Sequence, residues 1–349
     1  MDPFTSFPYD DDVLYWNGSQ PVGLSSNTAH ISWVMKMFSM AISSITLLLG
    51  TTGNGLVIFL TGFRMKKTVT TIWYLNLAVA DFIFAICLSS DITYEALNHW
   101  TLGRLMCKLD TVVPFLNMFA SVFFLTAISA DRCISVVHPV LALNHRTLWR
   151  ASLMAVFIWT MALVLSSPYF SFRDTERSFD DVILCTYNFG SDDASQLTTH
   201  RSMVATEFVL GFLIPFSVIL ACYCAIVVKL KGKIFGRFGR SFKIIVAVVV
   251  AFFCCWFPFH LFSILEMLDD SLEMKDILDI GFPLAKSLIC LNSCLNPLLY
   301  AFMGPDCRMT NWQSLLSAFK GAFSENWATA SFSSHRNSSS TSGMESSMV

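Results

Sequence analysis

The chain has 349 residues, of which 54% are hydrophobic and only 14% are charged, and its formal net charge is −2. With a mean hydropathy of +0.57, this composition is typical of an integral membrane protein. It excludes an ordinary soluble chain, whose apolar residues would be scattered at helical or strand periods rather than gathered into long blocks.

The apolar residues form seven blocks, each long enough to cross a hydrocarbon core of ~30 Å, which takes about 20 residues of helix. Prolines inside the blocks, at positions 168, 215, 258 and 297, predict kinks. Transmembrane helices tolerate such prolines because neighbouring helices and water satisfy the freed carbonyl groups. The blocks run roughly over Trp33–Phe63, Thr71–Ile92, Met106–Val137, Leu153–Phe172, Met203–Leu230, Phe242–Leu268 and Ile280–Phe302. The sequence therefore predicts an all-α membrane protein, built as a bundle of seven transmembrane helices.

The distribution of basic residues predicts the orientation of this bundle. Cytoplasmic connections collect Lys and Arg, and most of the 23 basic residues fall on one side if the N-terminus is outside. The sequon Asn17-Gly18-Ser19 then lies outside, as a glycosylated Asn17 requires. Residues 1–30 lack the pattern of a removable signal peptide, so we expect the first helix to act as its own insertion signal.

Only two of the 11 cysteines reach the exterior in this arrangement, namely Cys107 and Cys185. In an oxidising compartment they are the natural disulfide pair, which would join the outer end of the third helix to the loop between the fourth and fifth. Two free thiols are the alternative interpretation.

Several polar residues lie within the apolar blocks. Asp131 and Arg132 fall at the inner end of the third helix, where a pair of charges can also simply reach water. Asn54, Asp81 and Asn296 lie deeper. A carboxylate at bilayer depth costs about 2.5–3.5 kcal/mol and must find partners, so Asp81 is a functional candidate.

Six motifs, in order and spacing, resemble those of rhodopsin-like (class A) G-protein-coupled receptors over roughly residues 30–325. They are "GNGLV" around Asn54, "LNLAVAD" ending at Asp81, "SADRC" at Asp131, Trp159, "CCWFPFH" around Trp256 and "NSCLNPLLY" ending at Tyr300. Further stretches, such as "NHRT" and "SSPYFSFRDT", resemble the chemoattractant branch of formyl-peptide, chemerin-type and chemoattractant prostaglandin receptors. The chain looks nearest to the chemerin-type members.

The resemblance implies an activation switch at the inner half of the bundle. Arg132 would pair with Asp131 at rest, then release and contact a G protein as the sixth helix swings outward. An aromatic stripe is more often core than switch, which is how we interpret most phenylalanines. The implied switch residues are Asp131, Arg132, Tyr223, Phe252, Trp256, Pro258, Asn296, Pro297 and Tyr300.

The resemblance also implies an allosteric sodium ion, since oxygen ligands around a carboxylate suit a small hard cation. A structural water network is the competing interpretation, and neither a cofactor nor another metal is expected. The implied sodium site comprises Asp81, Asn117, Ser121, Asn292, Ser293 and Asn296.

The outer side carries many carboxylates, including Asp10, Asp11 and Asp12, and favours a basic peptide or protein ligand. Arg173 and Lys286 are basic groups at pocket depth, so either could bind a ligand carboxylate, or pair with Glu207 instead. Formyl-peptide recognition is not expected, because Phe115 and Glu207 replace the acid and arginine of those receptors. The expected ligand-binding residues are Asp91, Tyr94, Phe115, Arg173, Glu207, Trp256, Phe259, His260, Glu266 and Lys286.

Four segments follow from this interpretation: an extracellular acidic tail over 1–32, the receptor domain over 33–303, an amphipathic eighth helix over 304–325 and a disordered Ser-rich tail over 326–349. We expect receptor kinases to phosphorylate the Ser-rich tail, and arrestin to bind the phosphorylated segment. Its end, Ser347-Met348-Val349, fits a PDZ groove, although such short patterns arise often by chance.

We therefore expect a multi-pass plasma-membrane receptor that binds an extracellular chemerin-like peptide or small protein and activates an inhibitory-type heterotrimeric G protein. One alternative is a receptor for a lipid carboxylate. Another is a decoy receptor that internalises its ligand without G-protein signalling, which the unusual "GPDCRMTNW" start of the eighth helix favours. An enzyme or transporter is not expected, because histidines are scattered and inverted repeats are not visible. No nucleic-acid partner is expected.

Overall fold

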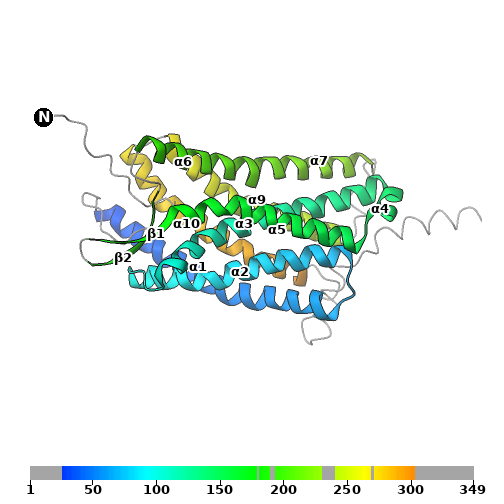
Figure 1. The fold of residues 1–349 in the computed structure, drawn as a ribbon, viewed down its shortest axis with the longest axis horizontal. Coiled ribbons are helices and arrows are strands. Elements are labelled where there is room, and N and C mark those ends of the chain that lie inside the picture. The colour runs from blue at the N-terminus through cyan, green and yellow to red at the C-terminus, as the bar shows by residue number, and fades with distance from the viewer. Residues whose placement is uncertain (1–25, 179–180, 189–192, 230–239, 269–270, 303–349) are drawn as a thin grey trace, which may run out of the picture.

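The computed structural model describes residues 26–178, 181–188, 193–229, 240–268 and 271–302. Within these residues, seven helices are long and apolar enough to cross a membrane, which confirms the predicted fold class. Figure 1 shows them running lengthwise side by side. The expected N-terminal tail, eighth helix and Ser-rich tail, with Asn17, lie outside the described residues.

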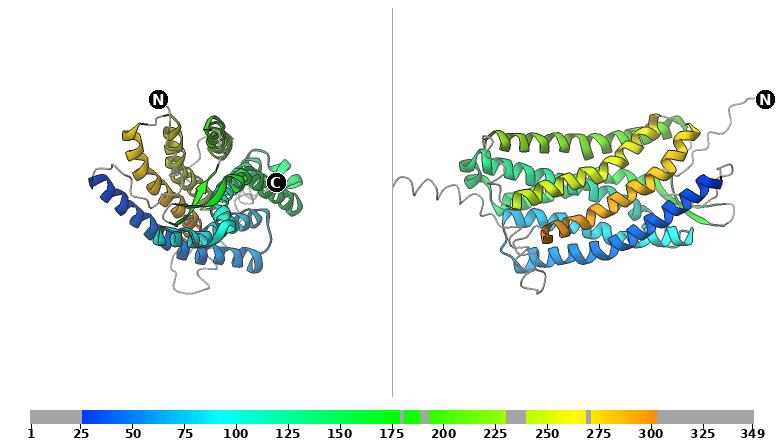
Figure 2. Two further views of the ribbon diagram at one scale, coloured as in Figure 1. Left: turned by 60° about the vertical axis from the view of Figure 1, so that its left-hand side comes forward. Right: turned by 180° about the vertical axis from the view of Figure 1, so that it is seen from behind.

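The first three spans occupy the first part of the chain. Helix α1 covers Ser26–Phe59 and continues into a π-helical turn, η1, over Leu60–Arg64. Helix α2 covers Val69–Leu97, and α3 covers Gly103–Val137. Helix α3 packs against α2, α5 and α7 and so holds three other spans together. Figure 2 shows the bundle from two further sides.

The remaining spans follow a short helix, α4 (Pro139–His145). Helix α5 covers Leu148–Phe172, and the fifth span is continuous over α6 (Asp193–Thr206), the π-helical η2 (Glu207–Leu213) and α7 (Ile214–Lys229). Helices α9 (Arg240–Leu268) and α10 (Leu272–Phe302) complete the bundle. The π-helical η2 ends two residues before Pro215, whose ring removes a backbone hydrogen bond.

Predicted helix ends were wrong by several residues at some positions, because hydropathy reports membrane depth whereas local capping decides where a helix begins. Helix α5 begins five residues before the predicted Leu153, where the Thr147 side chain accepts a hydrogen bond from the Arg150 backbone N–H. The outer end of the fifth span was predicted at Met203, but α6 already begins at Asp193. Its first turns are polar, so the apolar block could not mark them.

Between α5 and α6 the chain forms an antiparallel hairpin of β1 (Arg173–Arg177) and β2 (Ile183–Tyr187), in which Thr175 faces Cys185. The sequence predicted only a loop here. Cys185 bonds to Cys107 of α3, with 5.7 Å between their Cα atoms, so the predicted disulfide is confirmed. A hydrogen bond from Arg104 holds the pKa of the Asp174 carboxyl below its usual range and ties β1 to α3 a second time. We call this end of the bundle the hairpin end, and the opposite one the α4 end (Figure 1).

Small residues let α1 approach α2 closely. A Cβ atom added at Gly50 would lie 2.9 Å from the Cβ of Ala85, too close for either helix to keep its position. Gly62 in η1 has no other atom within 4 Å of such a Cβ.

We expect Gly50→Ala to separate the two helices and lower stability by about 1–3 kcal/mol, the usual cost of overpacking. Thermal unfolding of the detergent-solubilised protein would show a lower midpoint. Gly62→Ala is the matched control and should leave the midpoint unchanged. An unchanged midpoint for Gly50→Ala as well would contradict the close helix contact.

Candidate functional site

A cavity of about 100 Å³ lies at the hairpin end between α1, α2, α3, α9 and α10, and we call it the acidic pocket. Part of its wall is apolar, with Phe84, Leu88, Phe259 and Phe282. Its charged lining comprises Lys36, Asp91, Glu95, Asp110, Asp279 and Lys286. Carboxylates therefore outnumber ammonium groups by four to two in this lining.

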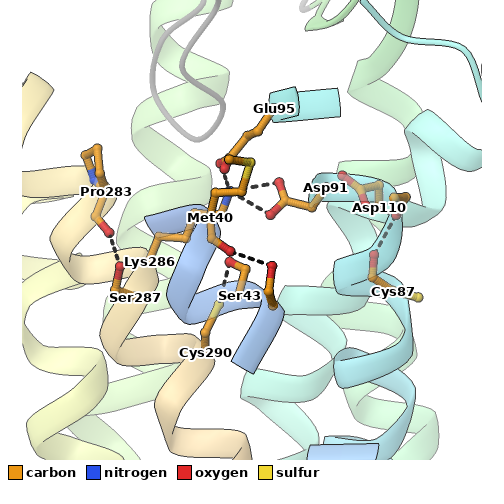
Figure 3. Close-up of polar contacts among 12 residues, drawn as sticks. Met40, Ser43, Cys87, Asp91, Glu95, Asp110, Pro283, Lys286, Ser287 and Cys290 are labelled. Atoms are coloured by element: carbon orange, nitrogen blue, oxygen red, sulfur yellow. Dashed lines mark hydrogen bonds and ion pairs between the residues drawn. The ribbon is translucent and has the colours of Figure 1, made fainter. Parts of the chain in front are cut away.

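Lys286 is the central cation of the acidic pocket. Its Nζ lies 2.8 Å from Asp91 and 2.5 Å from Glu95, and Figure 3 shows both carboxylates converging on it. Asp91 and Glu95 are four residues apart on α2, so they lie on the same face of the helix. The Asp91 side chain is only 4% exposed, whereas that of Lys286 is 24% exposed. The ion pairs thus connect α10 to α2 beside the cavity.

Two further polar contacts complete the pocket. Ser90 donates a hydrogen bond to Asp110 of α3, which neighbours the ion pairs in Figure 3. Lys36 of α1 donates to Asn98, the residue that ends α2 in a left-handed conformation. The charged groups of four helices are therefore held together at this end.

The expected role of Lys286 as a receptor for a ligand carboxylate stays a prediction, and the contacts of Lys286 weigh against it. Its ammonium group already contacts two carboxylates, and a ligand anion would have to compete with both of them in an apolar setting. Sequence reasoning missed Glu95, although its spacing of four from Asp91 on a predicted helix places it on the same face. Lys36 and Asp110 were missed as well, because nothing in their local sequence marks them as pocket residues.

Arg173, the other expected anion receptor, is built into the hairpin. It is 1% exposed, its guanidinium lies 4.4 Å above the centre of the Tyr187 ring, and its Nε is 3.3 Å from Sγ of Cys185. It does not line the acidic pocket, so the structure separates Arg173 from Lys286.

Of the other expected ligand residues, Phe259 lines the acidic pocket. Phe115 and Glu207 lie outside its lining and share one partner, Tyr169: the Phe115 ring stacks on Tyr169 at 3.6 Å between ring centroids, and the Tyr169 hydroxyl donates to Glu207. Glu207 therefore pairs with a tyrosine rather than with either expected basic residue. The others are His260, which packs among Phe208 and Phe212; Tyr94, which packs on Trp100; and Glu266, which is half-buried on α9.

The residues of the expected sodium site lie together in the middle of the bundle. Asn296 donates to Asp81 at 2.6 Å, and Ser121 donates to Asn117 at 3.2 Å. Asn117 lies 3.4 Å from Oγ of Ser293, and with its amide turned it would donate to Asp81 at 3.2 Å. All of these side chains, and that of Asn292, are at most 3% exposed. A buried carboxylate surrounded by hydroxyl and amide oxygens is a donor set that fits a small hard cation.

At the α4 end the expected contact between Asp131 and Arg132 is replaced by other partners. Asp131 accepts two hydrogen bonds from Arg146, at 2.8 and 3.1 Å, while Arg132 donates to Thr70 of α2 at 2.6 Å. Arg146 reaches Thr70 too, at 2.9 Å. The physical reason is helix geometry, because consecutive side chains do not face each other on a helix. Sequence reasoning missed Arg146 and Thr70, which lie far from the motif along the chain.

The other expected switch residues form a buried path along α9 and α10. Trp256 lies 6.0 Å from Phe259 and 5.9 Å from Phe252 between ring centroids, and both Trp256 and Phe252 are 2% exposed. Pro258 lies inside α9 and Pro297 inside α10, while Tyr223 packs edge-on against Phe242. The Tyr300 side chain lies outside the described residues.

Comparisons with known proteins agree with this architecture. Residues 53–300 match the family model described as "7 transmembrane receptor (rhodopsin family)", whose members are receptors rather than enzymes. The chain is 42% identical to Chemerin-like receptor 1 of Homo sapiens over 316 residues, which cover 86% of this chain and 84% of that protein. It is 41% identical to Formyl peptide receptor 2 of Mus musculus over 336 residues, 92% of this chain and 94% of that protein. The chain therefore belongs to the rhodopsin family of seven-transmembrane receptors.

Proposed function

We propose that the chain is a plasma-membrane chemoattractant receptor that binds an extracellular peptide or small protein and activates an inhibitory-type heterotrimeric G protein. The names of the relatives support this, since they include chemerin-like receptors and the C3a anaphylatoxin chemotactic receptor of Danio rerio, which is 42% identical over 83% of this chain. The excess of Lys and Arg on one side supports an orientation with the hairpin end outside.

The acidic pocket is the observation that carries the proposal. Four carboxylates against two ammonium groups leave its lining negative, and charges in a low-dielectric cavity attract a complementary ligand strongly. The acidic N-terminal segment adds attraction of the same sign at longer range. A ligand with a basic group at its inserting end therefore fits the pocket better than one with a terminal carboxylate.

The mechanism follows from the position of Lys286. A ligand cation entering the acidic pocket competes with Lys286 for Asp91 and Glu95, and any exchange of partners loosens α10 from α2. Phe259 lies in the same pocket wall and contacts Trp256, so the ligand also reaches the buried aromatic path of α9. At the α4 end, Arg132 would then leave Thr70 and contact the G protein.

A bound sodium ion at Asp81 would stabilise the resting packing between these two ends. Receptor kinases, arrestin and a PDZ protein are proposed partners of the C-terminal segment, which lies outside the described residues. A lipid carboxylate as ligand, or uptake without signalling, are the outcomes that the following experiments would separate from the proposal.

Lys286→Met removes the internal competitor of a ligand cation and should raise affinity for a basic peptide agonist about tenfold or more. It also leaves two buried carboxylates without their cation, so the ligand-free protein should unfold at a lower temperature. Bound basic peptide should then raise the unfolding temperature of the variant by more than that of the unaltered chain. Radioligand binding and thermal unfolding measure both effects.

Lys275→Met is the matched control, because Lys275 lies on the same helix but does not line the acidic pocket. It should leave both measurements unchanged. A carboxylate-terminated ligand that loses affinity in Lys286→Met, while a basic peptide gains none, would show that Lys286 binds the ligand anion.

Arg132→Ala should abolish agonist-stimulated nucleotide exchange on the G protein while agonist binding is kept. Arg146→Ala removes the partner of Asp131 and should raise agonist-independent exchange, because the resting arrangement at the α4 end is weakened. Lys67→Ala, an exposed charge nearby, serves as the control. Exchange that persists in Arg132→Ala contradicts the switch, and uptake without any exchange in the unaltered chain would identify a decoy.

Raising the sodium concentration should lower agonist affinity, and Asp81→Asn should remove this dependence. Since salt also screens the acidic outer side, the sodium must be exchanged for choline at constant ionic strength. A specific sodium effect that survives Asp81→Asn would refute the site.

A further inference from the structure

A second cavity lies at the α4 end, on the side of the bundle rather than inside it, and we call it the lateral groove. Residues of α2, α3, α4 and α5 line it, from Val69 and Trp73 on α2 to Met161 on α5. Its volume is about 480 Å³, within the ~300–1,000 Å³ of ligand pockets in general. It shares no residue with the acidic pocket.

The wall of the lateral groove is apolar and faces outward. Phe123 and Ala127 of α3 form one side, and Met154, Phe157 and Met161 of α5 form the other. Met154 is 48% exposed and Phe157 is 59% exposed, so the groove opens sideways, where a membrane-spanning bundle meets lipid. A hydrocarbon chain is therefore the matching occupant of this wall.

The rim of the groove at the α4 end is basic. Arg146 and Arg150 line it together with His145 and Asp131. Asp131 balances one of the two arginines through its ion pair with Arg146. The Arg150 side chain is exposed and contacts the ring and the backbone carbonyl of His145. Among the residues that line the groove, one carboxylate, Asp131, thus stands against two arginines, and the rim has an excess of positive charge. Charge complementarity favours an anionic head group here.

The length of the groove limits the occupant to a single leaflet. From Thr147 to Met161 there are 14 steps along α5, or about 21 Å at ~1.5 Å per residue. One leaflet of a hydrocarbon core of ~30 Å is roughly 15 Å thick, so the rest of the groove's length lies at the level of the lipid head groups. One acyl chain lying along α5, with its head at Arg150, matches these dimensions.

We propose that the lateral groove binds a long-chain fatty-acid carboxylate from the leaflet at the α4 end, which is the cytosolic leaflet in the orientation proposed above. Its carboxylate lies at Arg150 within reach of Arg146, and its chain lies between α3 and α5. Because the carboxylate competes with Asp131 for Arg146, occupancy acts on the residue next to Arg132. The site thus regulates the switch independently of any ligand in the acidic pocket.

The test uses the full chain in nanodiscs of neutral phosphatidylcholine with a photoactivatable palmitic acid. Irradiation should label peptides of α3 and α5 that line the groove. Met154→Trp fills the groove and should reduce this labelling to background, and Ala127→Phe provides a second filling variant from the opposite wall. Arg150→Gln should weaken labelling roughly two- to fivefold, the range of an exposed ion pair, while Arg150→Lys keeps it.

Val156→Trp is the matched control, since Val156 is a lipid-facing residue of α5, 64% exposed and outside the groove lining. It should label like the unaltered chain. Each variant must also unfold at an unchanged temperature to count. Equal labelling of the folded filling variants and Val156→Trp would show ordinary lipid contact and overturn the proposal. Equal competition by palmitic acid and palmityl alcohol, or displacement by cholesterol alone, would overturn the choice of an anionic single chain.

Discussion

The ion pairs of Lys286 with Asp91 and Glu95 bring three charges together within a largely apolar bundle. Removing such groups from water costs several kcal/mol per ion, and only close partners offset this cost. The pairing therefore fixes how the half of α10 at the hairpin end lies against α2. The lining of the pocket as a whole holds four carboxylates against two ammonium groups, and this excess underlies the cationic ligand proposed above.

The two ends of the receptor follow the same electrostatic pattern. At the hairpin end a lysine is shared by two acids, and at the α4 end a threonine, Thr70, is shared by two arginines. In each case a side chain from one helix holds two partners from elsewhere in the chain. Such a shared side chain can exchange partners at a small cost in free energy, because it keeps a hydrogen bond to the second partner when the first one leaves. The buried aromatic rings of α9 lie between these two ends.

The sequence was sufficient to predict the seven spans, the disulfide and the family, because each depends on long apolar blocks, a count of external cysteines or motifs with fixed spacing. It was insufficient wherever partners come from distant helices. Asp131 was expected to pair with its neighbour Arg132, but the nearest residue in sequence points about 100° away on a helix, and Arg146 takes its place. Lys286 was expected to bind a ligand carboxylate or to pair with Glu207, because nothing in its local sequence reveals that Asp91 and Glu95 face it. The hairpin escaped prediction because each strand is only five residues long and β1 carries four charged residues.

A close contact in the second half of α1 limits the room that α10 has to move. A Cβ at Gly53 would lie 3.0 Å from Pro297, so α10 touches the α1 backbone there and has little room to slide. Lys286 lies 11 residues before Pro297 on α10, about 16 Å away along the helix at ~1.5 Å per residue. Helix α10 is therefore held at two points, by its contact with Gly53 of α1 and by the ion pairs of Lys286 with α2. Any tilt of α10 would therefore turn about its contact with Gly53, close to Asn296, which donates a hydrogen bond to Asp81.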